Sequence, residues 1–375
     1  MRIIVMTNRF GDLGTHPQLT RVALHLKATG HDVRAISLAP PGSIAQMFSE
    51  TGIATDVIDM PWRGSLTPLV ARLSTRFRRW HPDVVIAFLY EAIIPARLAA
   101  RLSGVPVVIS SIRNEYFGPR YRELLLRATE RLSAATVVNS RRVAESLVRR
   151  GVANRGHLAV IHNGVDTTLF HPAPEIREDV RVSLGVSDAE FVWLTIGRLT
   201  EQKDYPSLLQ AFSRVVASRP GTRLLVVGRG SLQSELPDLA RRLGLTNDVS
   251  FLGYRADVPS LLAAADAFVL ASRYEGLPNV VMEALAAGVP VVGTAVGGMD
   301  ELVHEGVSGY LVPPSLPEAM ASAMRRMMDV SHEDRREMGM KGRALMHSHF
   351  EGETMMETWH GLINDTLGSV RRRPT

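Results

Sequence analysis

Short apolar runs alternate with longer amphipathic stretches along the first half of the chain. Six runs have the length and β-branched content of buried strands, at residues 3–7, 33–38, 55–59, 83–88, 106–110 and 135–139. Helical patterns lie between them. Strands that alternate with helices are typical of right-handed βαβ units, which build parallel sheets. The pattern therefore predicts an α/β fold.

The second half repeats this alternation from about residue 190 to 315. An apolar run at 192–196 passes through Gly197 into a basic turn, and an amphipathic helix is predicted from 206 to about 217. Further on, Gly276 and Pro278 precede an apolar, helix-compatible stretch at 280–285. The basic turn lies in a strand-to-helix crevice, which is where open α/β sheets bind ligands.

The length of the chain predicts its division into domains. A chain of 375 residues exceeds the size that one hydrophobic core usually serves. We therefore expect two domains, at residues 1–168 and 169–350, followed by a terminal helix and a basic tail within 351–375. A hydrophobic content of 45% fits a soluble globular protein with two cores.

Composition also excludes several kinds of site. The chain contains no cysteine, which excludes disulfides, a thiolate nucleophile and cysteine-based zinc sites. No uninterrupted apolar run reaches about 18 residues, so no transmembrane helix is expected. The N-terminus lacks the apolar core of a signal peptide. We expect a cytoplasmic protein.

The formal net charge is +5, and arginines gather in two amphipathic stretches at 66–80 and 121–132. One interpretation is peripheral contact with an anionic inner-membrane surface or a lipid-phosphate acceptor. The other is that the apolar residues face the sheet and the arginines face water. Nucleic acid is not an expected partner, because no recognition motif or aromatic platform accompanies the charge.

The basic turn supplies two candidate catalytic cations, Arg198 and Lys203. Arginine offers a planar bidentate fork and lysine a point charge, so together they could neutralise a diphosphate leaving group. The alternative is that both are solvated loop cations.

Two glutamates eight residues apart, Glu275 and Glu283, add to this pattern. Glu283 lies in the first turns of the predicted helix and can accept hydroxyl hydrogen bonds, while the free N–H groups after Glu275 suit an anion. This favours a site for a sugar joined to a phosphate. The alternative, a glycosidase carboxylate pair, requires two carboxyls facing each other across one bond.

The Glu275 and Glu283 pair, the Gly197-Arg198-Leu199 segment with Lys203, and the glycine turns that follow resemble retaining nucleotide-sugar glycosyltransferases of family 4 (glycosyl transferases group 1). The resemblance is strong from 190 to 315 and looser in the first half. It implies the GT-B fold, in which two Rossmann-like domains have parallel sheets that face each other across a central cleft. It also implies that the terminal helix packs back on the first domain.

The resemblance implies roles for particular residues. Arg198, Lys203 and Glu275 would be catalytic: the two cations would hold the donor diphosphate, and Glu275 the transferred sugar. Glu283 would hold the ribose. The remaining donor-binding residues would be Gly14, Gly197, Tyr254, Arg255, Gly276, Leu277, Pro278 and Asn279.

The first domain departs from the family pattern at the acceptor side. Many family members have a histidine after the fifth strand, where this chain has Arg113 and Asn114. These two would hold acceptor or donor hydroxyls, or serve the loop structurally. His16 could reach the same cleft, although a solvated loop histidine is the alternative. Without a histidine acid or base, a front-side transfer is expected, in which the departing diphosphate oxygen takes the acceptor proton.

The predicted function is retaining transfer of a sugar, of the hexosyltransferase type, from a nucleotide-sugar donor to an acceptor hydroxyl. UDP-sugars are the commonest donors in the resembling family, with GDP-sugars next. The acceptor would be a small molecule, a glycan or a lipid-linked compound. No cofactor and no metal are expected, because the chain has no Asp-x-Asp motif. The alternatives are a GT-B sugar-nucleotide epimerase or hydrolase, and a non-catalytic sugar-nucleotide-binding module.

Overall fold

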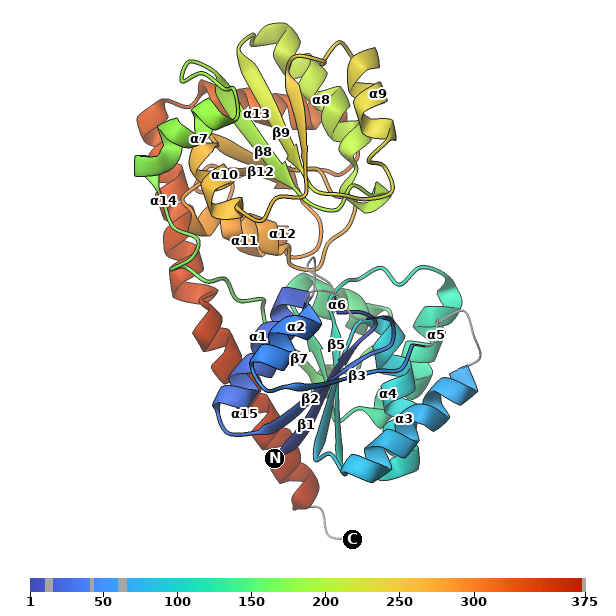
Figure 1. The fold of residues 1–375 in the computed structure, drawn as a ribbon. Coiled ribbons are helices and arrows are strands. Elements are labelled where there is room, and N and C mark those ends of the chain that lie inside the picture. The colour runs from blue at the N-terminus through green and yellow to red at the C-terminus, as the bar shows by residue number, and fades with distance from the viewer. Residues whose placement is uncertain (11–15, 41–43, 60–65, 373–375) are drawn as a thin grey trace. The chain divides into compact units, whose positions relative to one another are not determined.

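The computed structural model describes residues 1–10, 16–40, 44–59 and 66–372. It forms two compact units (Figure 1). Unit 1 comprises Met1–Asn163 and Glu353–Thr375, and unit 2 comprises Gly164–Gly352. The chain thus leaves unit 1 at Asn163, against the 168 expected, and its C-terminal segment belongs to unit 1.

Unit 1 is built on a seven-stranded parallel sheet in the order β3-β2-β1-β4-β5-β6-β7. Its strands are β1 (Arg2–Thr7), β2 (Asp32–Ser37), β3 (Ala54–Val57), β4 (Val84–Phe88), β5 (Val107–Ile112), β6 (Ala135–Val138) and β7 (Leu158–Val160). Its α-helices are α1 (His16–Ala28), α2 (Ile44–Glu50), α3 (Leu66–Trp80), α4 (Tyr90–Ser103), α5 (Arg120–Thr129), α6 (Arg141–Arg149) and α15 (Gly352–Arg371).

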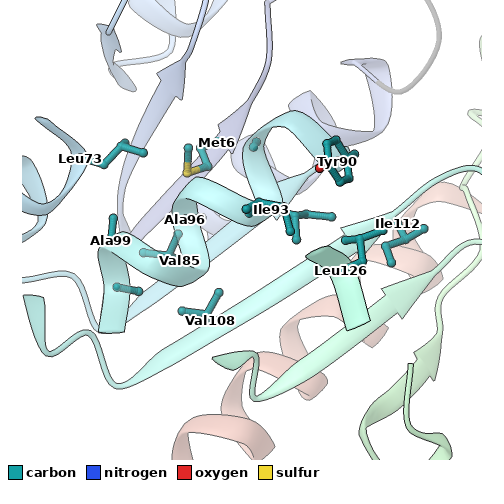
Figure 2. Packing of buried hydrophobic residues seen from close by; sticks show 14 of the residues in the cluster. Met6, Leu73, Val85, Tyr90, Ile93, Ala96, Ala99, Val108, Ile112 and Leu126 are labelled. Atoms are coloured by element: carbon teal, nitrogen blue, oxygen red, sulfur yellow. The ribbon is translucent and has the colours of Figure 1, made fainter. Parts of the chain in front are cut away.

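Helices cover both faces of this sheet (Figure 1). Side chains alternate between the faces, so Met6 and Val85 join a cluster with α3, α4, α5 and α6, whereas Val5 and Phe88 join a cluster with α1, α2 and α15. Figure 2 shows the first cluster, in which side chains from neighbouring strands meet α4. Burial on both faces explains why central strands such as β1 and β4 are nearly continuous apolar runs.

The two basic amphipathic stretches have different environments. In α3 the apolar residues Leu69, Leu73 and Phe77 are buried in the core, so the interpretation in which they face the sheet is confirmed for that helix. In α5, by contrast, Tyr121 and Leu124 are 51% and 60% exposed. No helix of the described residues is long and apolar enough to cross a membrane.

The terminal helix α15 belongs to the core of unit 1. Trp359, Ile363 and Leu367 are spaced by about one helical turn and are buried against the sheet face that carries Phe88. The indole of Trp359 lies 5.8 Å from the ring of Phe88. This helix therefore completes the second apolar layer of unit 1.

Unit 2 repeats the architecture with a six-stranded parallel sheet in the order β10-β9-β8-β11-β12-β13. Its strands are β8 (Phe191–Ile196), β9 (Thr222–Val227), β10 (Val249–Gly253), β11 (Ala267–Leu270), β12 (Val291–Thr294) and β13 (Gly309–Val312). Its α-helices are α7 (Arg177–Ser183), α8 (Tyr205–Ser218), α9 (Glu235–Arg242), α10 (Val258–Ala264), α11 (Asn279–Ala286), α12 (Met299–Leu302), α13 (Pro317–Asp329) and α14 (His332–His349). Two separate clusters line the faces of its sheet. The prediction of two Rossmann-like α/β domains is confirmed.

The predicted strand limits in unit 1 differ from the observed ones by one or two residues. β5 extends to Ile112, two residues beyond the predicted end, so Arg113 is the first residue after the strand. The short edge strand β7 was not predicted, because its three residues are half-buried and form no long apolar run.

Three histidines join α15 to the rest of unit 1. The Nε2 atoms of His31 and His360 lie 3.2 Å apart, and the rings of His25 and His360 are 6.0 Å apart. Burial lowers the pKa of His25, and His360 lowers it further, against the opposing effect of Glu357 and Glu353. The pKa of His31 is also lowered, first by burial and then by the N-terminal amine and His360.

The pH dependence of stability follows from these shifts. Because both pKa values lie below the ordinary 6.5, their stabilising contribution is present above pH 6.5 and is lost as the pH falls through the folded-state values. We expect the urea midpoint to fall between pH 7 and pH 5, and to fall less in a His360→Gln variant. Equal pH dependence in both proteins would contradict this role of the histidines.

Candidate active site

Three loops meet at the carboxyl ends of the central strands of unit 2. They follow β8, β11 and β12. The chain order of the strands reverses between β8 and β11, which are neighbours in the sheet. Such a switch point is where open α/β sheets bind ligands.

An ion pair connects the first two loops. The Lys203 Nζ atom lies 2.5 Å from Glu275 Oε1, and the Ser272 hydroxyl donates to the same oxygen at 2.6 Å. The side chains of Lys203 and Glu275 are 12% and 8% exposed. The structure thus brings together two of the three predicted catalytic residues.

Hydrogen bonds reinforce this connection. Gln202 Nε2 donates to the Tyr274 carbonyl at 3.0 Å, and the Arg273 N–H donates to the Gln202 carbonyl at 2.8 Å. Arg198, the third predicted catalytic residue, is exposed, and its Nη2 donates to Gln202 Oε1 at 3.3 Å. An exposed guanidinium and a half-buried ammonium therefore lie on one loop.

Asp204 braces the same loop, and sequence analysis missed it. Its side chain is fully buried and accepts hydrogen bonds from Arg273 Nη2 at 3.1 Å and from the Ser315 hydroxyl at 2.8 Å. Burial by itself would raise the pKa of Asp204, but these hydrogen bonds outweigh it and hold the pKa below its usual value. Its φ of 47° is left-handed, a region in which aspartate is enriched. No local spacing signals these long-range partners.

Glycine allows the third loop to approach the second. A Cβ atom on Gly297 would lie 2.4 Å from the Glu275 carbonyl oxygen, and its φ is +54°. The Gly298 N–H donates to the Gly276 carbonyl at 2.7 Å. The backbone around Glu275 is therefore fixed from both sides, by the Lys203 loop and by the glycine loop.

Helix α11 carries the second glutamate. No side chain caps the helix at Pro278, so its first N–H groups suit an anion. Glu283 is half-buried one turn into the helix, and Gly276, Leu277 and Pro278 are buried, while Asn279 is half-buried. This arrangement agrees with the predicted loop and helix.

The predicted base-binding residues lie after β10. Tyr254 is 44% exposed, with the Arg229 guanidinium 5.8 Å from its ring centroid. Arg255 forms a bidentate pair with Asp257, at 2.7 and 2.5 Å. Hydrogen bonding to Asp257 raises the pKa of Arg255 despite some burial. Tyr254 therefore offers an open ring, whereas Arg255 is engaged by a neighbour.

The predicted acceptor residues belong to unit 1. Arg113 is buried at the end of β5, and Asn114 accepts a hydrogen bond from the Tyr116 N–H at 3.2 Å. Gly14 lies outside the described residues, and the side chain of His16 is likewise not described. Among the described residues, no three histidine, aspartate or glutamate side chains gather so that they could hold a metal ion.

Comparison with known families gives two matches that together span most of the chain. The family described as "Glycosyl transferases group 1" matches residues 176–345. The family described as "Glycosyltransferase Family 4" matches residues 14–169. The first match contains all the candidate residues of unit 2.

Individual relatives agree with these matches. A GDP-mannose-dependent monoacylated alpha-(1-6)-phosphatidylinositol monomannoside mannosyltransferase of Corynebacterium glutamicum is 32% identical over 275 residues, which is 69% of this chain and 70% of that protein. A UDP-Gal:alpha-D-GlcNAc-diphosphoundecaprenol alpha-1,3-galactosyltransferase of Escherichia coli is 26% identical over 303 residues, 75% of this chain and 78% of that protein.

A solved structure has the same fold. Anabaena HepE, crystallised with UDP-glucose, superimposes with a TM-score of 0.84 at 25% identity, covering 98% of this chain and 100% of the HepE chain. Its similarity extends over both units.

Asp204 gives a test of how the site loops are held. We expect Asp204→Ala to lower the free energy of unfolding by about 2–3 kcal/mol, because it removes a buried charged acceptor of two hydrogen bonds. Asp204→Asn tolerates the left-handed backbone and keeps an acceptor, so it should cost less. Urea unfolding followed by circular dichroism measures both. If the alanine variant is as stable as wild type, Asp204 does not hold the loops.

Proposed function

Because this chain belongs to the group 1 glycosyl transferases, which have the GT-B fold, we propose that it transfers a sugar from a nucleoside diphosphate donor to an acceptor hydroxyl with retention of configuration. The observation that carries this proposal is the ion pair between half-buried Lys203 and buried Glu275 at the strand-order switch point, with Arg198 on the same loop. A cation and a carboxylate in contact can hold a phosphate and a sugar hydroxyl side by side.

UDP is the favoured donor nucleotide. The Escherichia coli relative is named for UDP-Gal, and HepE was crystallised with UDP-glucose. The Corynebacterium relative is named for GDP-mannose, which keeps a GDP-sugar as the second candidate. Tyr254 supplies an exposed ring on which either base could stack.

The donor would extend from Tyr254 to Glu275. Arg198 and Lys203 would hold the diphosphate, with the N-terminus of α11 beside it, and Glu283 would accept hydrogen bonds from the ribose. As Lys203 turns to the diphosphate, Glu275 becomes free to accept from hydroxyls of the transferred sugar. The carboxylate that neutralises Lys203 in the structure would thereby become a sugar ligand.

The transfer would proceed at one face of the sugar. The bond from the anomeric carbon to the diphosphate oxygen breaks, and a bond from that carbon to the acceptor oxygen forms on the same face. The acceptor proton passes to the departing diphosphate oxygen. Arg198 and Lys203 would stabilise the charge that grows on the diphosphate, so neither a metal nor a protein base is required.

The acceptor is proposed to bind unit 1, as a small molecule, a glycan or a lipid-linked compound. The exposed Tyr121 and Leu124 of α5, with arginines in the same helix, are the part of the chain that best supports contact with an anionic membrane surface. The cytoplasmic face of the inner membrane is the proposed location of that contact.

A donor screen tests the function. The full chain is incubated with UDP-glucose, UDP-galactose and GDP-mannose, with and without a panel of alkyl glycosides and polyprenyl-linked sugars. Nucleoside diphosphate released in step with a glycosylated product, in which NMR shows the donor's anomeric configuration, supports retaining transfer. Donor consumption without acceptor would support a hydrolase or epimerase, and binding without turnover a silent module.

Lys203 tests the leaving-group role. We expect Lys203→Ala to lower kcat by roughly 10²–10³, because removal of one preorganised electrostatic stabiliser has that effect. Arg198→Lys should also lower kcat, since a point charge does not reproduce a bidentate fork. Arg242→Ala, an exposed arginine on α9, is the matched control. A change in KM alone would indicate uniform binding instead.

Metal dependence gives a separate measurement. We expect turnover to survive EDTA, because Arg198 and Lys203 supply the charge that a divalent cation would otherwise provide. Activity that disappears on chelation and returns with Mg²⁺ or Mn²⁺ would contradict this assignment.

A further inference from the structure

Three arginines are buried in the described part of the chain: Arg97, Arg113 and Arg181. Arg97 donates to the hydroxyls of Ser110 and Ser133 at 3.0 and 2.8 Å and to the Leu126 carbonyl at 3.0 Å. Burial lowers the pKa of Arg97 to about 10, and Glu130 opposes that shift. Its charge is thus satisfied within unit 1.

Arg181, in unit 2, is satisfied by a carboxylate. Its Nη1 lies 3.4 Å from Asp266 Oδ2, and its Nη2 donates to the Ser187 carbonyl at 3.0 Å. The Arg181 Nε has no hydrogen-bond partner among the described residues, but it lies 3.6 Å from Asp188 Oδ1 in an ion pair. Each of these two arginines therefore has a carboxylate or several hydrogen-bond acceptors around its charge.

Arg113 differs from both, because the described residues give it one hydrogen-bond acceptor and no carboxylate. Its Nη1 donates to Asn163 Oδ1 at 3.1 Å, but its buried Nε has no partner among the described residues. Its guanidinium carbon lies 5.2 Å from the ring centroid of Phe88 and 5.8 Å from that of Trp359. Burial lowers the pKa of Arg113 to about 9, with no acidic group opposing the shift, so it stays charged at neutral pH.

Two more unpartnered polar atoms occur on the same face of the sheet. Ser111 lies in β5, two residues before Arg113, and pairs with Val137 of the neighbouring strand β6. Asn139 is the first residue after β6. By the alternation of strand side chains, Ser111, Val137 and Asn139 share the face to which Arg113 belongs. The Ser111 hydroxyl and Asn139 Oδ1 are buried and have no hydrogen-bond partner within the described residues.

We propose that Arg113, Ser111 and Asn139 form an oxyanion subsite that binds the phosphate or carboxylate of an acidic acceptor. This inference rests on the proposed transfer function. Arg113 and the Ser111 hydroxyl donate to the oxyanion, while Asn139 Oδ1 accepts from an adjacent hydroxyl of the acceptor. The donor diphosphate already has Arg198, Lys203 and the start of α11 in unit 2, so the cation of unit 1 serves a different anion.

Direct binding tests the subsite without knowledge of the acceptor. The full chain is first saturated with UDP, which occupies the phosphate-binding cations of unit 2. Methyl phosphate and acetate are then titrated calorimetrically, to distinguish a phosphate from a carboxylate subsite. We expect one of them to bind wild type at least about tenfold more tightly than Arg113→Gln, because a charge-assisted hydrogen bond is lost.

Control variants separate this effect from general loss of charge or folding. Arg101→Gln removes an exposed positive charge on α4 of the same unit and should bind the anion like wild type. Ser111→Ala removes a hydroxyl that has no partner, so it should preserve the thermal midpoint yet weaken anion binding several-fold. This variant keeps the test decisive if Arg113→Gln does not fold.

Three outcomes would overturn the inference. The first is that neither anion binds. The second is that wild type, Arg113→Gln and Ser111→Ala bind the anion with equal affinity. The third is that Arg113→Gln loses affinity for UDP-glucuronate but not for methyl phosphate or acetate. The last would assign the arginine to the donor. Failure of both UDP and GDP to bind would instead contradict the proposed transferase function, so the two failures are distinguishable.

Discussion

Both sheets consist of parallel strands with an apolar cluster on each face. Side chains along such strands pack into the hydrophobic cores, because helices cover each face of the sheet. The large and charged polar side chains of the candidate sites therefore gather where strands end and loops begin, whereas within β5 only small hydroxyls such as Ser111 occur. The candidate residues obey this constraint: Lys203 and Glu275 follow β8 and β11, and Arg113 and Asn139 follow β5 and β6.

The Lys203 and Glu275 pair is better explained by positioning than by stability. A pair this buried gains Coulomb energy but loses hydration, and the two effects often cancel, whereas removal of one partner alone costs about 3–5 kcal/mol. Hydrogen bonds from Ser272 and between Gln202 and Tyr274 hold both loops in the geometry of the pair. Preorganised charge of this kind acts without reorganisation when a ligand arrives.

The sequence predicted the fold more completely than it predicted the contacts of the site. Long apolar runs predicted six strands of unit 1. They did not predict β7, because its three residues are half-buried and form no such run. The loop of Lys203 and the helix of Glu283 were also predicted. The contact of Lys203 with Glu275 spans 72 residues, so it depends on strand order, which local periodicity does not encode.

Asp204 and Arg113 show two further limits of sequence analysis. The role of Asp204 depends on Arg273 and Ser315, which are 69 and 111 residues away. The resemblance suggested a ligand role for Arg113, with a structural role in the loop as the alternative. That the described residues give it no carboxylate partner became visible only in the packed structure. The roles proposed for Gly14 and His16 stay predictions.

Lys203 of unit 2 and Arg113 of unit 1 lie in opposite electrostatic environments. An anion that binds Lys203 must replace Glu275 as its partner, which leaves the Glu275 carboxylate without its cation. A sugar diphosphate would compensate this loss, because its sugar hydroxyls could donate hydrogen bonds to Glu275. Arg113 has no carboxylate to displace within the described residues, and an anion bound there would compensate a charge that burial has already desolvated. A neutral group in the same position would leave that penalty in place. With the proposed site roles, unit 2 would select its ligand by exchange of partners, whereas unit 1 would select one by its charge.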